Sequence, residues 1–149
     1  AGDPKRIQHF IKVHALARYI GLEEGLTGAE LETLEAAAYV HDIGIRLAEK
    51  QYGYSNGRLQ EELGPRAAEE LLSRLGFPED LTRRAAWLVG RHHTYSGIQG
   101  ADYRILVEAD FLVNLFEKNA PREEIEAVRE RIFRTETGRE LCRTMFGLD

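Results

Sequence analysis

Two adjacent side chains, His41 and Asp42, can bind the same metal ion. They follow the small and apolar residues Ala37 to Val40, a run of helical character. Gly44, a residue type that often ends helices, comes soon afterwards. Imidazole nitrogen and carboxylate oxygen together suit Fe, Mn, Zn, Co or Ni, and suit Mg less well. We therefore expect one divalent transition metal at this pair.

Asp110 is the sharpest anomaly in the sequence, because it lies in the apolar stretch 106–113. An unpaired buried carboxylate costs several kcal/mol, so this one should be protonated, paired with a cation or bound to a metal. An ion pair or a helix-cap hydrogen bond is the plainer explanation. His14 follows Ile7, Phe10 and Ile11 at helical spacing, which predicts that it faces inward. For a single histidine, a hydrogen-bonded core residue is the plainer alternative.

Taken together, these residues form a nitrogen and oxygen ligand set on three separate helices. The predicted metal ligands are His14, His41, Asp42 and Asp110. Four protein ligands leave positions free on an octahedral ion, which favours a catalytic site over a closed structural one.

The elements that must position these residues are all predicted to be helices, because no stretch alternates at period two. Asp3 is expected to cap the first helix, and Thr27 with Glu30 forms a capping-box pattern at the second. The first expected helix begins at Pro4 and ends at Gly21 or Gly25, and the second follows Thr27 and ends at Gly44. Further helices are expected at about 59–75 with an interruption near 64–65, from 78 to about 93, at 101–117, from Pro121 onward and at 137–146. Residues 45–58 and 94–100 are expected to be loops. We predict one all-α domain over residues 1–149, a helical bundle of about six to seven helices.

Composition narrows the function class. The chain has 149 residues and a net charge of -5, which argues against a protein that coats nucleic acid. Its one cysteine, Cys142, excludes an internal disulfide and a cysteine-rich zinc site, and fits a cytoplasmic protein. No apolar run approaches the roughly 20 residues of a membrane span, so no membrane partner is expected.

The order of these residues resembles the pattern H … HD … D of the HD-domain superfamily of metal-dependent phosphohydrolases. The sequence at 41–44 resembles the HD-I-G form of the motif, and Gly64-Pro65 with residues 67–72 resembles the next family helix. The triplets 92–94 and 108–110 resemble the later His-Thr element and the closing A-D. The resemblance implies an all-α HD fold in which His14, His41, Asp42 and Asp110 bind one divalent ion.

Some relatives hold two metals with the help of further histidines. His92 and His93 are present here, but the histidine expected just before Gly64-Pro65 is Leu63. Glu61 or Glu62 is the available substitute. With a single metal, His92 or His93 would instead bind substrate phosphate or act as a general acid toward the leaving oxygen.

The resemblance predicts hydrolysis of a phosphate ester or anhydride, with a nucleotide as the expected substrate, through a metal-activated water. The predicted catalytic residues are Asp42, Arg46 and His92. Weaker candidates for substrate binding are Lys50, Tyr54, Arg58, Arg91 and Tyr95, for which a solvated surface position is the plainer expectation. The apolar character of the fifth expected helix predicts either a buried helix or a homodimer contact, and rests on Leu112, Val113, Leu115 and Phe116.

Four alternative functions stay open at this point. A symmetrical dinucleoside polyphosphate hydrolase with a dinuclear site and an HD-type diiron oxygenase would both need a second metal. A non-catalytic HD signalling module should have lost metal ligands. A plain helical scaffold would carry these histidines for unrelated reasons.

Overall fold

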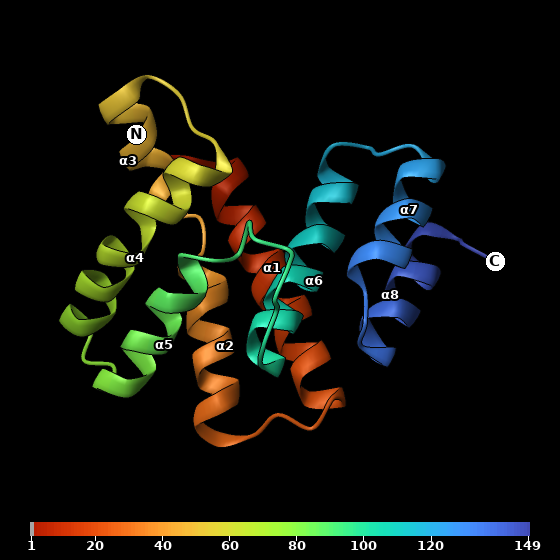
Figure 1. The fold of residues 1–149 in the computed structure, drawn as a ribbon, viewed down its shortest axis with the longest axis horizontal. Coiled ribbons are helices and arrows are strands. Elements are labelled where there is room, and N and C mark those ends of the chain that lie inside the picture. The colour runs from red at the N-terminus through yellow and green to blue at the C-terminus, as the bar shows by residue number, and fades with distance from the viewer. Residues whose placement is uncertain (1) are drawn as a thin grey trace.

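The computed structural model describes residues 2–149, and these residues form eight α-helices and no strand (Figure 1). The all-α prediction is confirmed. The helices are α1 (Pro4–Glu23), α2 (Gly28–Val40), α3 (Gly44–Tyr52), α4 (Gly57–Arg74), α5 (Glu79–Val89), α6 (Ala101–Glu117), α7 (Arg122–Ile132) and α8 (Glu136–Phe146). None of them is long and apolar enough to cross a membrane.

The additional helix is α3, in a segment predicted to be a loop. Gly44 does not end a helix but begins α3, after the three-residue turn 41–43. A Cβ at Gly44 would lie 2.8 Å from the backbone oxygen of Gln60, so the glycine lets α3 and α4 approach closely. The predicted loop is correct only for the short stretch that starts at Gly53, whose left-handed φ of 81° ends α3.

The helix starts were predicted with mixed success. Asp3 caps α1, and its Oδ1 accepts a hydrogen bond from the backbone N–H of Arg6 at 3.1 Å. Thr27 is the N-cap of α2, but its side chain makes no capping hydrogen bond, so the predicted capping box is wrong. Gly28 follows with a left-handed φ of 53°, which departs from the helical geometry that a capping box requires. Helix α4 runs through Pro65 without the expected interruption.

The core lies where α1, α2, α5 and α6 pack together, with α3 and α4 on one side and α7 and α8 on the other (Figure 1). Helix α6 is the most deeply buried. Leu112, Val113 and Leu115 lie in the core of the monomer, whereas Phe116 is exposed. Burial within the chain therefore accounts for most of the apolar residues of 112–116, and the homodimer stays a prediction.

Glu108 ties α6 to the segment between α7 and α8. Its carboxylate is fully buried and accepts hydrogen bonds from the backbone N–H groups of Arg134 and Thr135, at 2.6 and 3.0 Å. The hydroxyl of Thr135 donates a third at 2.5 Å. Burial raises the pKa of Glu108, although these hydrogen bonds act in the opposite direction. A Cβ at Gly138 would collide with this carboxylate, so α8 packs here only through a glycine.

Candidate metal centre

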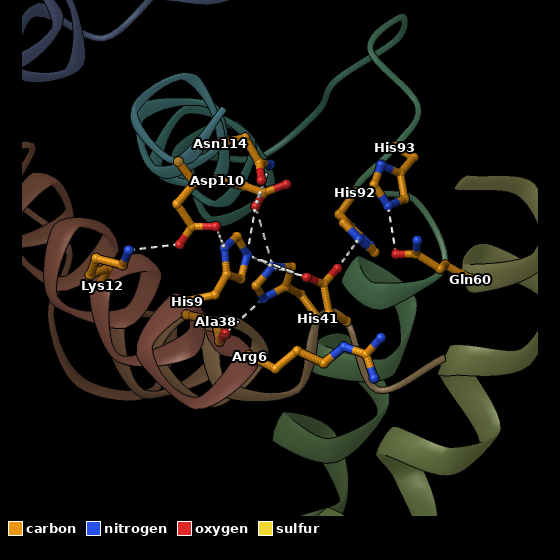
Figure 2. A network of polar contacts seen from close by, with 12 residues as sticks. Arg6, His9, Lys12, Ala38, His41, Gln60, His92, His93, Asp110 and Asn114 are labelled. Carbon is orange, nitrogen blue, oxygen red and sulfur yellow. Dashed lines mark hydrogen bonds and ion pairs between the residues drawn. The ribbon is translucent and has the colours of Figure 1, made fainter. Parts of the chain in front are cut away.

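Four side chains from three parts of the chain bring their ligand atoms close together, and Figure 2 labels three of them, His9, His41 and Asp110. His9 Nε2, on α1, lies 3.2 Å from His41 Nε2 and 3.2 Å from Asp110 Oδ1. His41 Nε2 lies 3.3 Å from Asp110 Oδ1, and Asp42 Oδ2 lies 3.3 Å from each of the two imidazole nitrogens. Ligands about 2.1 Å from one ion are themselves about 3.0–3.4 Å apart. The spacing of this cluster therefore matches a metal coordination sphere.

In each of the two histidine rings, the hydrogen bond made by Nδ1 determines the tautomer. His41 Nδ1–H donates to the backbone oxygen of Ala38 at 2.7 Å, and His9 Nδ1–H donates to Glu117 Oε2 at 3.2 Å. Each ring in its neutral form therefore presents the lone pair of Nε2 to the cluster. Two such lone pairs and two carboxylate oxygens repel one another unless a cation lies between them. The donor set thus fits a divalent metal, whose charge the two carboxylates would neutralise.

The electrostatics of the cluster agree with a site built for a cation. Burial opposes a charge on His9, yet hydrogen bonds to Asp110 and Asp42 raise its pKa to about 9. Burial likewise opposes a charge on His41, and the same two carboxylates raise its pKa. Burial alone would raise the pKa of both aspartates, but His41 and His9 hold them well below the usual range. Positive charge is therefore strongly favoured at this point of the fold.

The profile of the HD domain matches residues 6–137, which includes every member of this cluster. The chain belongs to the HD-domain family. It is thus a member of a family of metal-dependent hydrolases, as the resemblance implied.

A solved structure supports the same assignment. The chain is similar to a crystal structure described as a predicted HD superfamily hydrolase from an uncultured Thermotogales bacterium. The two share 26% sequence identity, the match covers 97% of this chain and 76% of the other, and the TM-score is 0.67. The comparison with curated proteins found no match.

The sequence prediction for this cluster was wrong at one position. His9, and not His14, is the histidine of α1 that lies beside His41 and Asp110. His14 Nε2 lies 2.9 Å from Glu35 Oε1, and its ring stacks on Tyr39 with centroids 4.1 Å apart. The buried stripe of α1 consists of His9, Val13, Ala17 and Ile20, at spacings of four, four and three. That stripe is present in the sequence. The competing stripe that contains Ile7 and Ile11 misled the assignment, since both isoleucines are about half exposed.

On the other side of Asp42 lies a second group of histidines. Asp42 Oδ1 is 3.3 Å from His92 Nε2, and His92 Nδ1–H donates to the backbone oxygen of Val89 at 2.8 Å. His93 Nε2 is 2.8 Å from Gln60 Oε1 (Figure 2). Burial and the neighbouring His92 lower the pKa of His93 to about 4. Asp42, His92 and His93 are close enough to hold an ion, although His93 already has a protein partner.

Glu61 was the suggested substitute for the absent histidine, but its carboxylate is hydrogen-bonded to the loop after α5. Its carboxylate accepts hydrogen bonds from the backbone N–H of His93 at 3.0 Å and from the Thr94 hydroxyl at 2.9 Å. Glu62 is exposed. Tyr95 closes this side, with its ring 5.0 Å from that of Phe111, and burial raises its pKa to about 12.

Of the cationic candidates, only Arg46 borders the cluster, in a cleft that also contacts Asp42. Arg91 lies over the ring of Trp87 at 4.1 Å. Lys50, Tyr54 and Arg58 are exposed on α3, on the following loop and on the first turn of α4. None of these last three lines either of the two clefts at Asp42.

Proposed function

We propose that this HD domain is a metal-dependent phosphohydrolase that cleaves a phosphate ester or anhydride, with nucleotides as the first substrates to test. The supporting observation is that the ligand cluster borders open space. Clefts of about 300 and 350 Å³ both reach Asp42, and the second also reaches His9. A structural metal site is closed by its protein ligands, whereas a catalytic site keeps positions free for water and substrate.

His9, His41, Asp42 and Asp110 are the residues that would hold the ion. A divalent ion bound there would supply a water of lowered pKa and would polarise a phosphoryl oxygen. Asn114 Nδ2 donates to Asp110 Oδ1 at 2.9 Å and so orients that carboxylate. Glu117 orients the His9 ring by accepting the hydrogen bond of its Nδ1–H.

Asp42 is the residue placed to handle a proton. Its Oδ2 faces the two histidines of the cluster, while its Oδ1 faces His92 Nε2 at 3.3 Å. Oδ1 is therefore available to orient an attacking water and accept its proton. His92 Nε2 can hold that proton in turn and return it to the leaving oxygen. Because His92 is buried and its other nitrogen is hydrogen-bonded to Val89, its ring keeps a fixed orientation.

Two basic side chains are placed to bind the phosphoryl oxygens, on which negative charge concentrates during transfer. Arg46 lines one cleft beside Asp42, and Lys5 lines the other. Arg46 is the arginine that the sequence suggested for this role, and Lys5 is a further candidate because it lines the second cleft.

The dinuclear alternatives require a second ion beside His92 and His93. The contact between His93 and Gln60 argues for a single ion. The clustering of four candidate ligands, with His9 in place of His14, argues against a signalling module without catalysis.

The test combines metal analysis with a substrate panel. Protein purified without chelator should carry about one Fe, Mn, Zn, Co or Ni per chain by elemental mass spectrometry. It should then release phosphate or nitrophenol from nucleotides, p-nitrophenyl phosphate or bis-p-nitrophenyl phosphate. Asp42→Asn should abolish turnover, while His14→Ala should retain it. Metal-loaded protein that is inactive on the whole panel would contradict the proposal, and about two ions per chain would favour the dinuclear functions.

A further inference from the structure

The cleft between the start of α1 and the turn before α3 has mainly apolar walls. Ile7 and Phe10 contribute from α1, and Ile43 contributes from the turn. The cleft measures about 300 Å³ and has Asp42, one of the cluster ligands, in its lining. An apolar surface therefore begins directly beside a carboxylate of the cluster.

The apolar residues of this wall are grouped together and are not isolated on the surface. Single exposed apolar residues are common in soluble proteins. Here Ile7, 53% exposed, lies beside the half-buried Phe10 and Ile43 around a single hollow. Phe10 also packs its edge on the ring of His41, with centroids 5.9 Å apart. The apolar wall thus extends inward to the buried ring of His41, and Asp42 is the cluster residue that the cleft exposes.

Two arginines border the same cleft, and they differ in availability. Arg6 is neutralised by two carboxylates, Asp3 at 3.3 Å and Glu49 at 2.5 Å. Arg46 is exposed and forms no ion pair with any carboxylate of residues 2–149. The free positive charge of the cleft is therefore that of Arg46, next to Asp42.

We infer that this cleft holds the uncharged, flat organic group of a phosphate monoester while the phosphoryl group lies between Asp42 and Arg46. The inference rests on the proposed phosphohydrolase function and names its substrate class. An apolar wall contributes to binding only if the substrate has an apolar face, and a free cation contributes only if the substrate is an anion. A phosphate monoester of an aryl alcohol or of a nucleoside has both features.

The chemistry of the walls also limits selectivity. Apolar side chains pack on any flat ring but do not distinguish its hydrogen-bonding edge. Arg6 and Asp3, the polar side chains at the opening, already pair with each other. The cleft should therefore accept a nucleobase or a simple aryl ring with little discrimination. Its volume is at the small end of ligand pockets, which favours one ring system over a dinucleotide.

The test compares two phosphonates, whose carbon–phosphorus bond is not hydrolysed. Phenylphosphonate and methylphosphonate share the anionic group and differ only in the organic part. Isothermal titration of the metal-loaded protein should show phenylphosphonate binding at least about tenfold more tightly, because only its ring covers the apolar wall. Equal affinities would overturn the inference.

A matched pair of variants locates the effect. Ile7→Asn should reduce phenylphosphonate affinity about tenfold and leave methylphosphonate affinity unchanged. Ile11→Asn is the control, since Ile11 is one turn further along α1, equally exposed at 50%, and outside the cleft. Both side chains are exposed, so both variants should fold. A loss that is the same in the two variants would contradict the cleft assignment.

Turnover separates this inference from the proposed function. Phenyl phosphate and the four ribonucleoside monophosphates should be hydrolysed with similar kcat/KM, and ribose 5-phosphate and pyrophosphate more slowly by at least about tenfold. Preference for one base would show a nucleobase reader instead and overturn the aryl-tolerant cleft. Hydrolysis without any preference for ring-bearing esters would overturn the inference alone. Failure of both phosphonates to bind, with no hydrolysis of any ester, would overturn the proposed function as well.

Discussion

Asp42 has a group of histidines on each side, and the Nε2 atoms of the two groups have different kinds of partner. On the Oδ2 side, His9 and His41 direct their Nε2 atoms at carboxylate oxygens and at each other. On the Oδ1 side, His93 Nε2 meets the amide of Gln60. The same residue types therefore produce a cluster that needs a cation in one place and a hydrogen-bonded pair in the other.

The difference lies in what each histidine has as a neighbour. Asp110 completes the first side with a second carboxylate, which the second side lacks. The carboxylates raise the pKa of His9 to about 9, whereas burial and His92 lower that of His93 to about 4. A pair of adjacent histidines in a sequence is therefore weaker evidence for a metal than one histidine opposite two carboxylates.

Removing Asp110 should cause the largest change in metal content, because Asp110 is the carboxylate that distinguishes the first side from the second. Asp110→Ala deletes a ligand and leaves His9 and His41 with one carboxylate, so metal content should fall from about one per chain to near zero, with loss of hydrolysis. His93→Ala should keep the first ion. Elemental analysis of both variants measures this directly. Full metal content in Asp110→Ala would contradict the centre as described.

The two histidines of α1 provide the next comparison. His9→Ala should lose the metal, while His14→Ala should retain it, because His14 pairs with Glu35 and stacks on Tyr39 away from the cluster. Both variants remove one imidazole from the same helix. A difference in metal content between them therefore does not come from a general loss of helix stability. Metal loss in His14→Ala alone would reverse the assignment.

Glu117 should have a smaller effect, because it contacts His9, a proposed ligand, and would not contact the ion itself. Its carboxylate accepts from His9 Nδ1 and pairs with Lys12 at 2.7 Å. Glu117→Gln should weaken metal affinity by about 10–100-fold with one ion still bound at saturation. Glu35→Gln, which alters the partner of His14, is the control and should leave the affinity unchanged. Competition with a chromophoric chelator measures both affinities.

The smallest expected effect is on the pH dependence of the metal-free protein. The pKa of His9 is raised from 6.5 to about 9 in the folded state, so its protonated form stabilises the fold. That contribution is complete below about pH 6.5 and is lost as the pH rises through about 9. Chemical denaturation of the apoprotein at several pH values should show this decline, and His9→Gln should flatten it. An apoprotein whose stability rises over this interval would contradict the stabilising role of the protonated His9.

Much of this arrangement was predictable from residue order. The all-α class, His41 with Asp42 and the burial of Asp110 followed from helical periodicity and from the HD pattern. His9 was missed because two stripes of apolar residues run along α1, and only packing shows which one is buried. Helix α3 was missed because Gly44 was interpreted as a stop, when its role is to admit α4. Gln60 could not be foreseen as the partner of His93, since the two meet only when α4 packs beside the loop after α5.

Glu108 joins the α7–α8 pair to the rest of the bundle. The α7–α8 pair packs less extensively on the bundle than α1, α2, α5 and α6 pack on one another, and Glu108 holds its connecting segment. Amide hydrogen exchange should therefore show α7 and α8 opening as a separate unit at a lower free energy than global unfolding. The HD match includes all of α7 and ends at residue 137, just inside α8. In such an opening, His9, His41, Asp42 and Asp110 should keep their positions, because none of them lies on α7 or α8.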